Sequence, residues 1–313
     1  MPQNANYASI LPLITTPRLN HFITTFRPVK NCEVYGVYIW TQHAASSIYP
    51  LLQNLEITLR NSIDRQATLR FGQKWWDNPA LHCRGRKQST MFYKKITAAV
   101  DKLNQDWEQE ERQKGNRNPG NPPVWSHDQI IAATDFSAWH FILKDDFAAP
   151  TGRNSGNHQN FLWPQSFGRC FKNYATFSRS SGDARQKLQN RLIELRKYRN
   201  RLFHHQPIWV KAPNVTDAAT AIDTIRVKIK RIAQVINAID PDVENIMAIT
   251  GLFSHALRIC SVQELGIYTF SRAPRPLTRR QKRSLRNVIS AGSQELSQTF
   301  EYGKKLYSLH PAR

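Results

Sequence analysis

One long segment, residues 38–70, carries the repeat of an amphipathic helix. Its apolar residues recur at intervals of three and four positions, as Ile48, Leu52, Leu55, Leu59 and Ile63. That spacing places all of them on one helical face, which must be buried against other elements. Because the chain shows no clean run of the alternating pattern typical of a half-buried strand, the sequence predicts an all-α fold.

Similar periodicity, with Asp residues at N-cap positions and breakers between segments, predicts the other helices. They cover residues 90–114, 127–143, 184–204, 217–239 and 242–258, and a last helix ends at about residue 308. The aromatic residues of segment 161–174 are expected to pack together as a hydrophobic knot. The predicted domains are an N-terminal extension (1–34), a helical domain (35–260) and a basic C-terminal segment (261–313).

The charge of the chain indicates what kind of partner it binds. There are 44 Lys and Arg residues against 23 Asp and Glu, which gives a formal net charge of +21. Such an excess favours polyanions through phosphate contacts and counterion release, so nucleic acid is the leading expectation. The basic run near the C-terminus is predicted to contact phosphates without sequence specificity, or else to be a solvated tail. It contains Arg279, Arg280, Lys282 and Arg283.

Several classes of protein do not fit the sequence. No stretch approaches the roughly 18 consecutive apolar residues of a membrane span, and the first residues lack the features of a signal peptide. The four cysteines form no CxxC pair, so neither a zinc site nor a disulfide framework is predicted. They are Cys32, Cys83, Cys170 and Cys260. We therefore expect a cytoplasmic protein with reduced thiols, with no metal, cofactor or membrane partner.

The predicted helix over 184–204 holds an arginine within its apolar stripe. The stripe consists of Leu188, Leu192, Leu195 and Leu202. At about 100° per residue, Arg199 lies roughly 20° from Leu188. A guanidinium keeps its charge, so burying it alone would cost several kcal/mol. Its charge must be compensated by a carboxylate, by a subunit interface with trapped solvent, or by a bound phosphate.

One carboxylate is placed in a similar way on the 38–70 helix. Glu56 lies roughly 40° from Leu52, on the edge of the apolar stripe. We therefore predict that Glu56 faces Arg199 across the two core helices. Two interpretations of this pair remain open, a structural buried salt bridge and a part of a functional site.

A polar row lies next to Arg199. Asn200 and His204 are four residues apart, so they are neighbours on one helical face, and Arg196 extends the row by one turn. The Asn amide can then fix the orientation of the imidazole. By itself a histidine near a helix end is more often a cap or a solvated residue, so the wider sequence block decides its role.

The block RNRLFHHQPIW, residues 199–209, resembles the RNR…HHEPI block of the Abi-like family, whose members are related to AbiD and AbiF. Its first six residues fit the RNxxxH form of the HEPN superfamily motif. Three more blocks are similar to that family, in the same order: LEITLRNSID (55–64), TDFSAWHFIL (134–143) and LWPQSFGRCF (162–171). Gln206 departs from the acidic residue usual in the family, and Phe203 is bulkier than the common Ala.

The resemblance implies a HEPN-like helical bundle and a metal-independent endoribonuclease of the abortive-infection or toxin type. It also implies a homodimer, because the active site of the family is completed at a symmetric interface. The expected catalytic residues are Arg199, Asn200 and His204. Supporting roles are expected for Glu56, Arg60, Arg196 and His205, although for His205 a helix cap or packing against Trp209 is the favoured interpretation. RNA contacts are expected from Arg196, Arg201 and the C-terminal basic run, although for Arg201 a solvated surface charge is the favoured interpretation.

Three alternatives stay open. The chain could be a non-catalytic RNA-binding module, for which Gln206 is the one supporting feature. It could be a toxin held inactive by a small non-coding RNA or by an antitoxin protein. A DNA-binding regulator is disfavoured, because no helix-turn-helix spacing is present. Trp75 and Trp76 could stack on bases, but core packing is the favoured interpretation.

Overall fold

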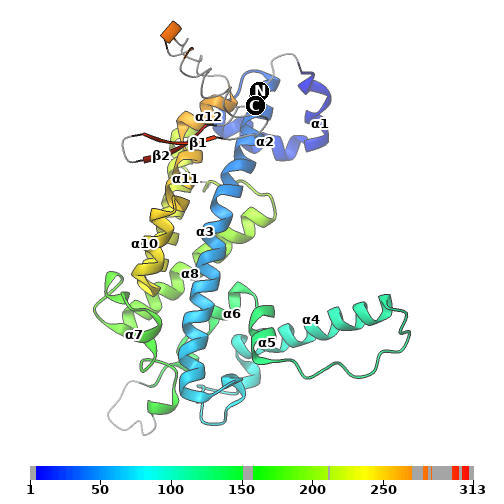
Figure 1. Ribbon diagram of the computed structural model, residues 1–313, viewed down its shortest axis with the longest axis vertical. Helices are drawn as coiled ribbons and strands as arrows, with labels where there is room; N and C mark the ends of the chain where they lie inside the picture. The colour runs from blue at the N-terminus through cyan, green and yellow to red at the C-terminus, as the bar shows by residue number, and fades with distance from the viewer. Residues whose placement is uncertain are drawn as a thin grey trace. The chain divides into compact units, whose positions relative to one another are not determined.

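The computed structural model describes residues 5–150, 158–210, 212–269, 278–280, 283, 298–302 and 305–309 (Figure 1). The helices are α1 (Leu11–Ile14), α2 (Thr16–Phe26), α3 (Asn31–Phe71), α4 (Met91–Gln113), α5 (His127–Ala133), α6 (Phe136–Phe141), α7 (Phe167–Cys170), α8 (Ser181–Phe203), α9 (Ala218–Ile239), α10 (Pro241–Ile249), α11 (Leu252–Ile259) and α12 (Val262–Tyr268). The chain divides into two compact units, one of residues 1–40 and 263–313 and the other of residues 41–262.

The first unit contains helices within the predicted N-terminal extension, residues 1–34. Both α1 and α2 precede α3, which begins at Asn31 rather than at Tyr38. Aromatic contacts hold this region together, with ring centroids 5.3 Å apart for Tyr7–Tyr35 and 6.0 Å apart for Phe22–Tyr38. Since α1 has only four residues, its sequence is too short to display a helical period.

In the second unit, the predicted stripe of α3 is the core. Ile48, Leu55, Leu59 and Ile63 are fully buried, and Leu52 is nearly so. The stripe of α8 is buried in the same way, which confirms the helical periods of both segments. Helix α9 packs against α8, α10 and α11.

Three predicted helix boundaries are wrong, and side-chain caps explain the first two. Ser180 rather than Asp183 caps α8, because its hydroxyl accepts the Asp183 N–H and the Asp183 carboxylate pairs with Lys187. The predicted helix over 127–143 is two helices, since the side chain of Asp135 caps a new one at α6. The segment 242–258 likewise divides into α10 and α11 at Gly251, whose φ of 80° suits glycine.

The aromatic residues between the helices are buried, as the sequence predicts. Trp163, Phe167 and Phe171 pack together, which confirms the hydrophobic knot. Trp75 and Trp76 are 0% and 2% exposed, so core packing and not base stacking is their role.

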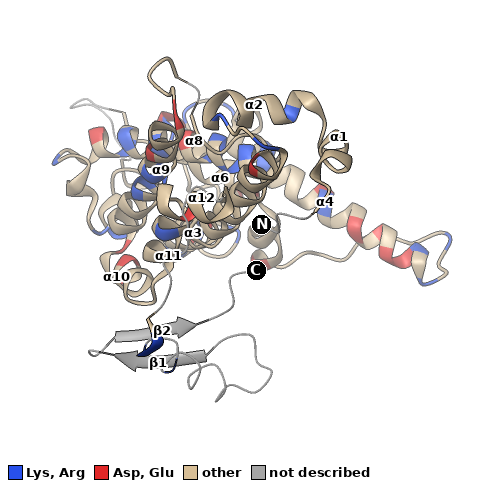
Figure 2. Cartoon of the chain, turned by 90° about the horizontal axis from the view of Figure 1, so that it is seen from above, with Lys and Arg blue, Asp and Glu red and all other residues tan. Residues whose placement is uncertain are grey.

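Acidic residues lie along α4, as Figure 2 shows.

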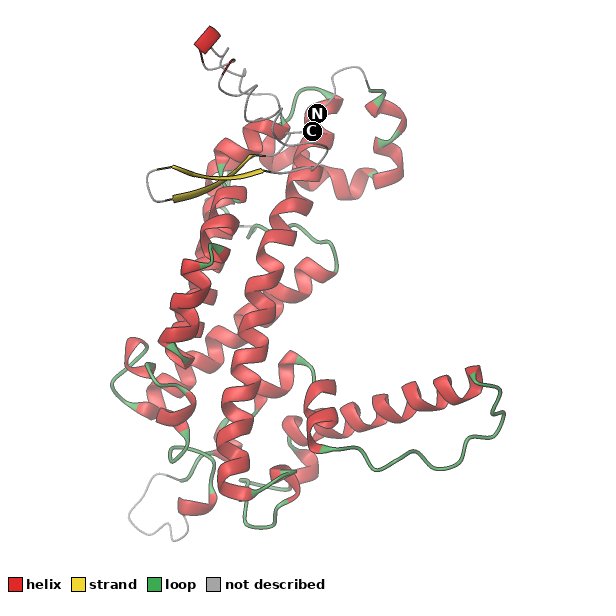
Figure 3. Ribbon diagram, in the orientation of Figure 1, coloured by secondary structure: helices red, strands yellow, loops and turns green. Residues whose placement is uncertain are grey.

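The predicted last helix is wrong within the described part of the C-terminal segment. Residues Gln298–Tyr302 and Lys305–Leu309 form the antiparallel strands β1 and β2, paired from Gln298 with Leu309 to Tyr302 with Lys305 (Figure 3). Thr, Phe and Tyr residues favour strands. Among the described residues, no helix is both long and apolar enough to cross a membrane.

Candidate functional site

The candidate site lies at the C-terminal end of α8. Helix α8 ends at Phe203, and His204 is its C-cap. The N–H of Gln206 donates to the carbonyl of Arg201 at 2.9 Å, and the N–H of His205 donates to that of Leu202 at 3.1 Å. These two bonds form a Schellman motif, with His205 in the left-handed region at φ 51°. The backbone of His205 therefore closes the helix, as the cap interpretation predicts.

Replacing His205 by glycine should stabilise the protein by up to about 1 kcal/mol, because glycine adopts the left-handed conformation without steric cost. Urea unfolding of the wild type and of His205→Gly measures this difference. A loss of stability would show that the imidazole itself makes a contact that outweighs the backbone strain.

The predicted pairing of Glu56 with Arg199 is confirmed. Arg199 Nε lies 3.6 Å from Glu56 Oε2, and the two side chains are 33% and 20% exposed. This separation is an ion pair but too long for a good hydrogen bond. The guanidinium also lies over the ring of Phe203, at 4.5 Å from its centroid. Arg199 is thus held between α3 and α8 with one side open to solvent.

Other arginines of the second unit are used differently. Arg70 and Arg226 donate to backbone carbonyls, and Arg185 donates to both a carbonyl and Asp145. In contrast, Arg199 makes no hydrogen bond to any described residue. Its N–H donors remain available, which is the arrangement that an arginine needs in order to bind an anion.

The electrostatics of Glu56 also differ from those of a structural ion pair. Burial raises the pKa of Glu56, and the charges of Arg199 and Arg60 only partly oppose this effect. Glu194 is the structural counterpart, since it pairs with Lys228 and Arg231, and these contacts hold its pKa below the ordinary value. The surroundings of Glu56 therefore disfavour its charged form, whereas those of Glu194 favour it.

Replacing Glu56 by glutamine should lower activity while leaving the fold intact. Because burial raises its pKa, the ionised carboxylate opposes folding at neutral pH, and this penalty disappears as pH falls below the unfolded value. The stability of the variant relative to that of the wild type should therefore be greater at neutral pH than near pH 4. Thermal unfolding at the two pH values measures the difference, and a marked loss of stability at neutral pH would favour a purely structural salt bridge.

The polar row next to Arg199 is only partly assembled in the described chain. Asn200 and His204 are both exposed, and the His204 N–H donates to the Asn200 carbonyl at 2.9 Å. No hydrogen bond links their side chains within the described residues, so the predicted orienting role of Asn200 stays a prediction. Both side chains are accessible to a ligand.

Arg196 and Arg201 are both partly buried. The Nε of Arg196 is buried and has no hydrogen-bond partner among the described residues. Burial, followed by the charge of Arg196, lowers the pKa of His140 to about 4, so this buried histidine of α6 is neutral at physiological pH. Arg201 donates to the Trp209 carbonyl at 2.9 Å and so anchors the segment after α8. RNA contacts by either arginine remain predictions.

The remaining predicted residues are Arg60 on α3 and the C-terminal basic run. Arg60, one turn beyond Glu56 on α3, donates from its Nε to Asn61 at 3.3 Å. Arg279, Arg280 and Arg283 are exposed. Lys282 lies outside the described residues.

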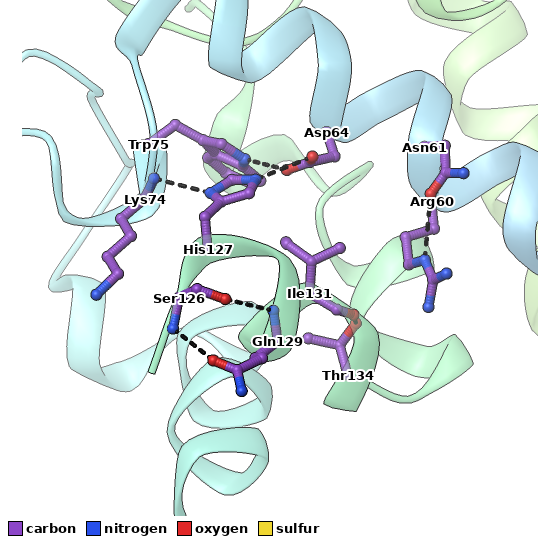
Figure 4. Close-up of polar contacts among 10 residues, drawn as sticks. All are labelled: Arg60, Asn61, Asp64, Lys74, Trp75, Ser126, His127, Gln129, Ile131 and Thr134. Atoms are coloured by element: carbon purple, nitrogen blue, oxygen red, sulfur yellow. Dashed lines mark hydrogen bonds and ion pairs between the residues drawn. The ribbon is translucent and has the colours of Figure 1, made fainter. Parts of the chain in front are cut away.

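Sequence reasoning missed a second histidine–carboxylate pair, drawn in Figure 4. His127 Nδ1 accepts the Lys74 N–H at 2.9 Å, so its Nε2 carries the proton and donates to Asp64 at 3.0 Å. The other Asp64 oxygen accepts the Trp75 indole N–H at 2.7 Å. Both nitrogens of His127 are used, and the residue is buried, so this network joins α3 to α5. In the sequence, the only sign of this network is Asp64 at the end of the 55–64 block.

Replacing Asp64 by asparagine should lower the free energy of unfolding by about 1–3 kcal/mol, because the new amide places a donor against a buried donor. Urea unfolding checks this result. An unchanged unfolding midpoint with a lost activity would instead assign a functional role to Asp64.

A groove of about 780 Å³ is separate from the candidate site. It is lined by residues of α8, α9 and α10, including Lys187, Arg191, Glu194 and Glu244. None of the predicted site residues lines it. Within the described residues, no group of three or more His, Cys, Asp and Glu side chains lies together as metal ligands would.

Comparison with known families matches residues 18–210 to the Abi-like protein family. Because the match covers more than half of the 313 residues, the chain belongs to this family, and the predicted resemblance is confirmed. Membership suggests a protein of phage abortive infection. Searches of the curated proteins and of the solved structures give no match.

Proposed function

We propose that this protein is a metal-independent endoribonuclease that acts in phage abortive infection, and that the end of α8 is its active site. The observation that supports this most is the state of Arg199. Its guanidinium is half-exposed, makes an ion pair but no hydrogen bond among the described residues, and lies five residues before the exposed His204. A cation with free donors beside an imidazole suits phosphate chemistry.

In the proposed reaction the ribose 2′-OH attacks the adjacent phosphorus, and the bond from phosphorus to the 5′-oxygen breaks. His204 takes the proton of the 2′-OH and delivers a proton to the leaving 5′-oxygen, a role suited to histidine because an imidazole both accepts and donates protons near neutral pH. Arg199 binds the phosphate and stabilises the charge that develops on its oxygens. Asn200 orients the imidazole. The products are a 2′,3′-cyclic phosphate and a 5′-hydroxyl.

Two copies of the chain complete the proposed site. Arg199 and His204 are five residues apart, about 140° around a helix, so one helix directs them poorly at a single phosphate. Both side chains lie at the surface, and neither lines the groove described above. A second α8 across a two-fold axis would enclose the phosphate between the two helix ends.

The test is incubation of the purified protein with end-labelled single-stranded RNA, and with DNA of the same sequence, in the presence of EDTA. RNA should be cut to fragments that end in a cyclic phosphate, whereas DNA should survive because it lacks the 2′-OH. RNA binding without cleavage would instead support a non-catalytic binding module, or a toxin that requires release from an RNA or protein inhibitor.

A further inference from the structure

Two aromatic side chains are exposed beside the candidate site. Tyr49 on α3 is 45% exposed and Phe203 on α8 is 44% exposed. Every other aromatic side chain that the structure describes is buried or half-buried. The two rings contact each other edge to face, with centroids 5.4 Å apart and planes at 72°. Aromatic rings carry a large apolar surface, so an exposed contacting pair indicates a surface for a ligand.

The aromatic pair lies next to the residues that are proposed to act on the phosphate. Phe203 directly precedes His204 in the sequence, and the Arg199 guanidinium carbon lies 4.5 Å from the centroid of its ring. A phosphate held by Arg199 would therefore bring the neighbouring nucleoside to the aromatic pair. Gln53 is exposed one turn after Tyr49 on α3, where its amide can reach the edge of a base.

We propose that Tyr49 and Phe203 form a base-stacking subsite, which binds an unpaired nucleobase of single-stranded RNA next to the phosphate held by Arg199. This inference rests on the proposed function, because it names how the same site holds its substrate. Aromatic side chains stack on splayed bases in single-stranded RNA recognition. The adjacent Arg199 guanidinium and the formal net charge of +21 suit a polyanion better than an apolar protein surface. The subsite also predicts a preference for single-stranded over paired RNA, since paired bases are already stacked.

The test compares two probes that carry the same phosphate charge. One is a short 2′-O-methyl oligoribonucleotide, which lacks the nucleophile and is not cut, and the other is an abasic strand of equal length. Phe203→Leu and Tyr49→Leu should each weaken binding of the first probe about tenfold and leave binding of the abasic strand unchanged. Phe203→Trp should retain the wild-type affinity. Leu69→Ala, which removes another exposed apolar side chain from α3, is the matched control.

Two outcomes would overturn the subsite. Equal losses for both probes would mean that the rings only position Arg199. Unchanged affinity with a lower mass in sedimentation velocity would mean that the rings join two copies of the chain. The proposed function fails separately: if the wild type cuts no RNA but Phe203→Leu still binds the base-containing probe tenfold more weakly, the subsite stands without the nuclease.

Discussion

Replacing His204 by alanine should reduce the rate of RNA cleavage by about 10²–10⁴-fold while RNA affinity and stability remain close to those of the wild type. The side chain is exposed at the C-cap of α8, so its removal leaves no cavity and breaks no described hydrogen bond of the imidazole. The backbone bonds of the Schellman motif involve neighbouring residues and persist in the variant. Single-turnover cleavage measures the chemical step directly.

Added imidazole distinguishes proton transfer from a positioning effect in this variant. Free imidazole should restore part of the cleavage rate of His204→Ala, because the position of the lost side chain is open to solvent and a small base can reach the bound RNA there. Full activity of His204→Ala would mean that the proposed active site is wrong. An equal loss of cleavage in His205→Gly would assign proton transfer to His205 instead.

The sequence predicted the core of the second unit because its physical signal is periodic. Leucine and isoleucine spacing located α3 and α8, and the same wheel arithmetic located Glu56 opposite Arg199. The arithmetic worked because both helices are long and regular, so a residue's angle follows from its number. The Asp217 cap of α9 was predicted for a similar reason, since the capping residue lies next to its helix.

Features that depend on contacts distant in sequence were missed. Tyr49 and Phe203 are 154 positions apart, and nothing local marks them as a pair. The network of Asp64, His127 and the Lys74 backbone joins α3 to α5 in the same way. The start of α8 was also missed, because Ser180 and Asp183 are both good N-cap residues, and in the structure Ser180 caps the helix while Asp183 pairs with Lys187.

Replacing Arg199 by alanine should lower the cleavage rate by about 10²–10³-fold, the effect of removing one donor group from a charge-stabilising site. This loss of rate should be larger than the loss caused by replacing any other arginine on α8 without unfolding the protein. Arg199 is the arginine of α8 that combines an accessible guanidinium with the neighbouring carboxylate of Glu56. Arg199→Lys should recover only part of the rate, since an ammonium keeps the charge but loses the planar fork that binds two phosphate oxygens. Lys197→Ala, on the exposed face of α8, removes one positive charge from the same helix and serves as the control.

The salt dependence of RNA binding separates the two roles that Arg199 could have. If it is one phosphate contact among many, Arg199→Ala and Lys197→Ala should lower the salt slope of the affinity equally and change the cleavage rate little. If Arg199 acts on the reacting phosphate, its loss should act mainly on the single-turnover rate at saturating RNA, because the transition state carries more charge than the bound substrate. Glu56→Gln should then show a smaller loss of the single-turnover rate. The carboxylate does not contact RNA itself, but it limits the positions that the guanidinium can take.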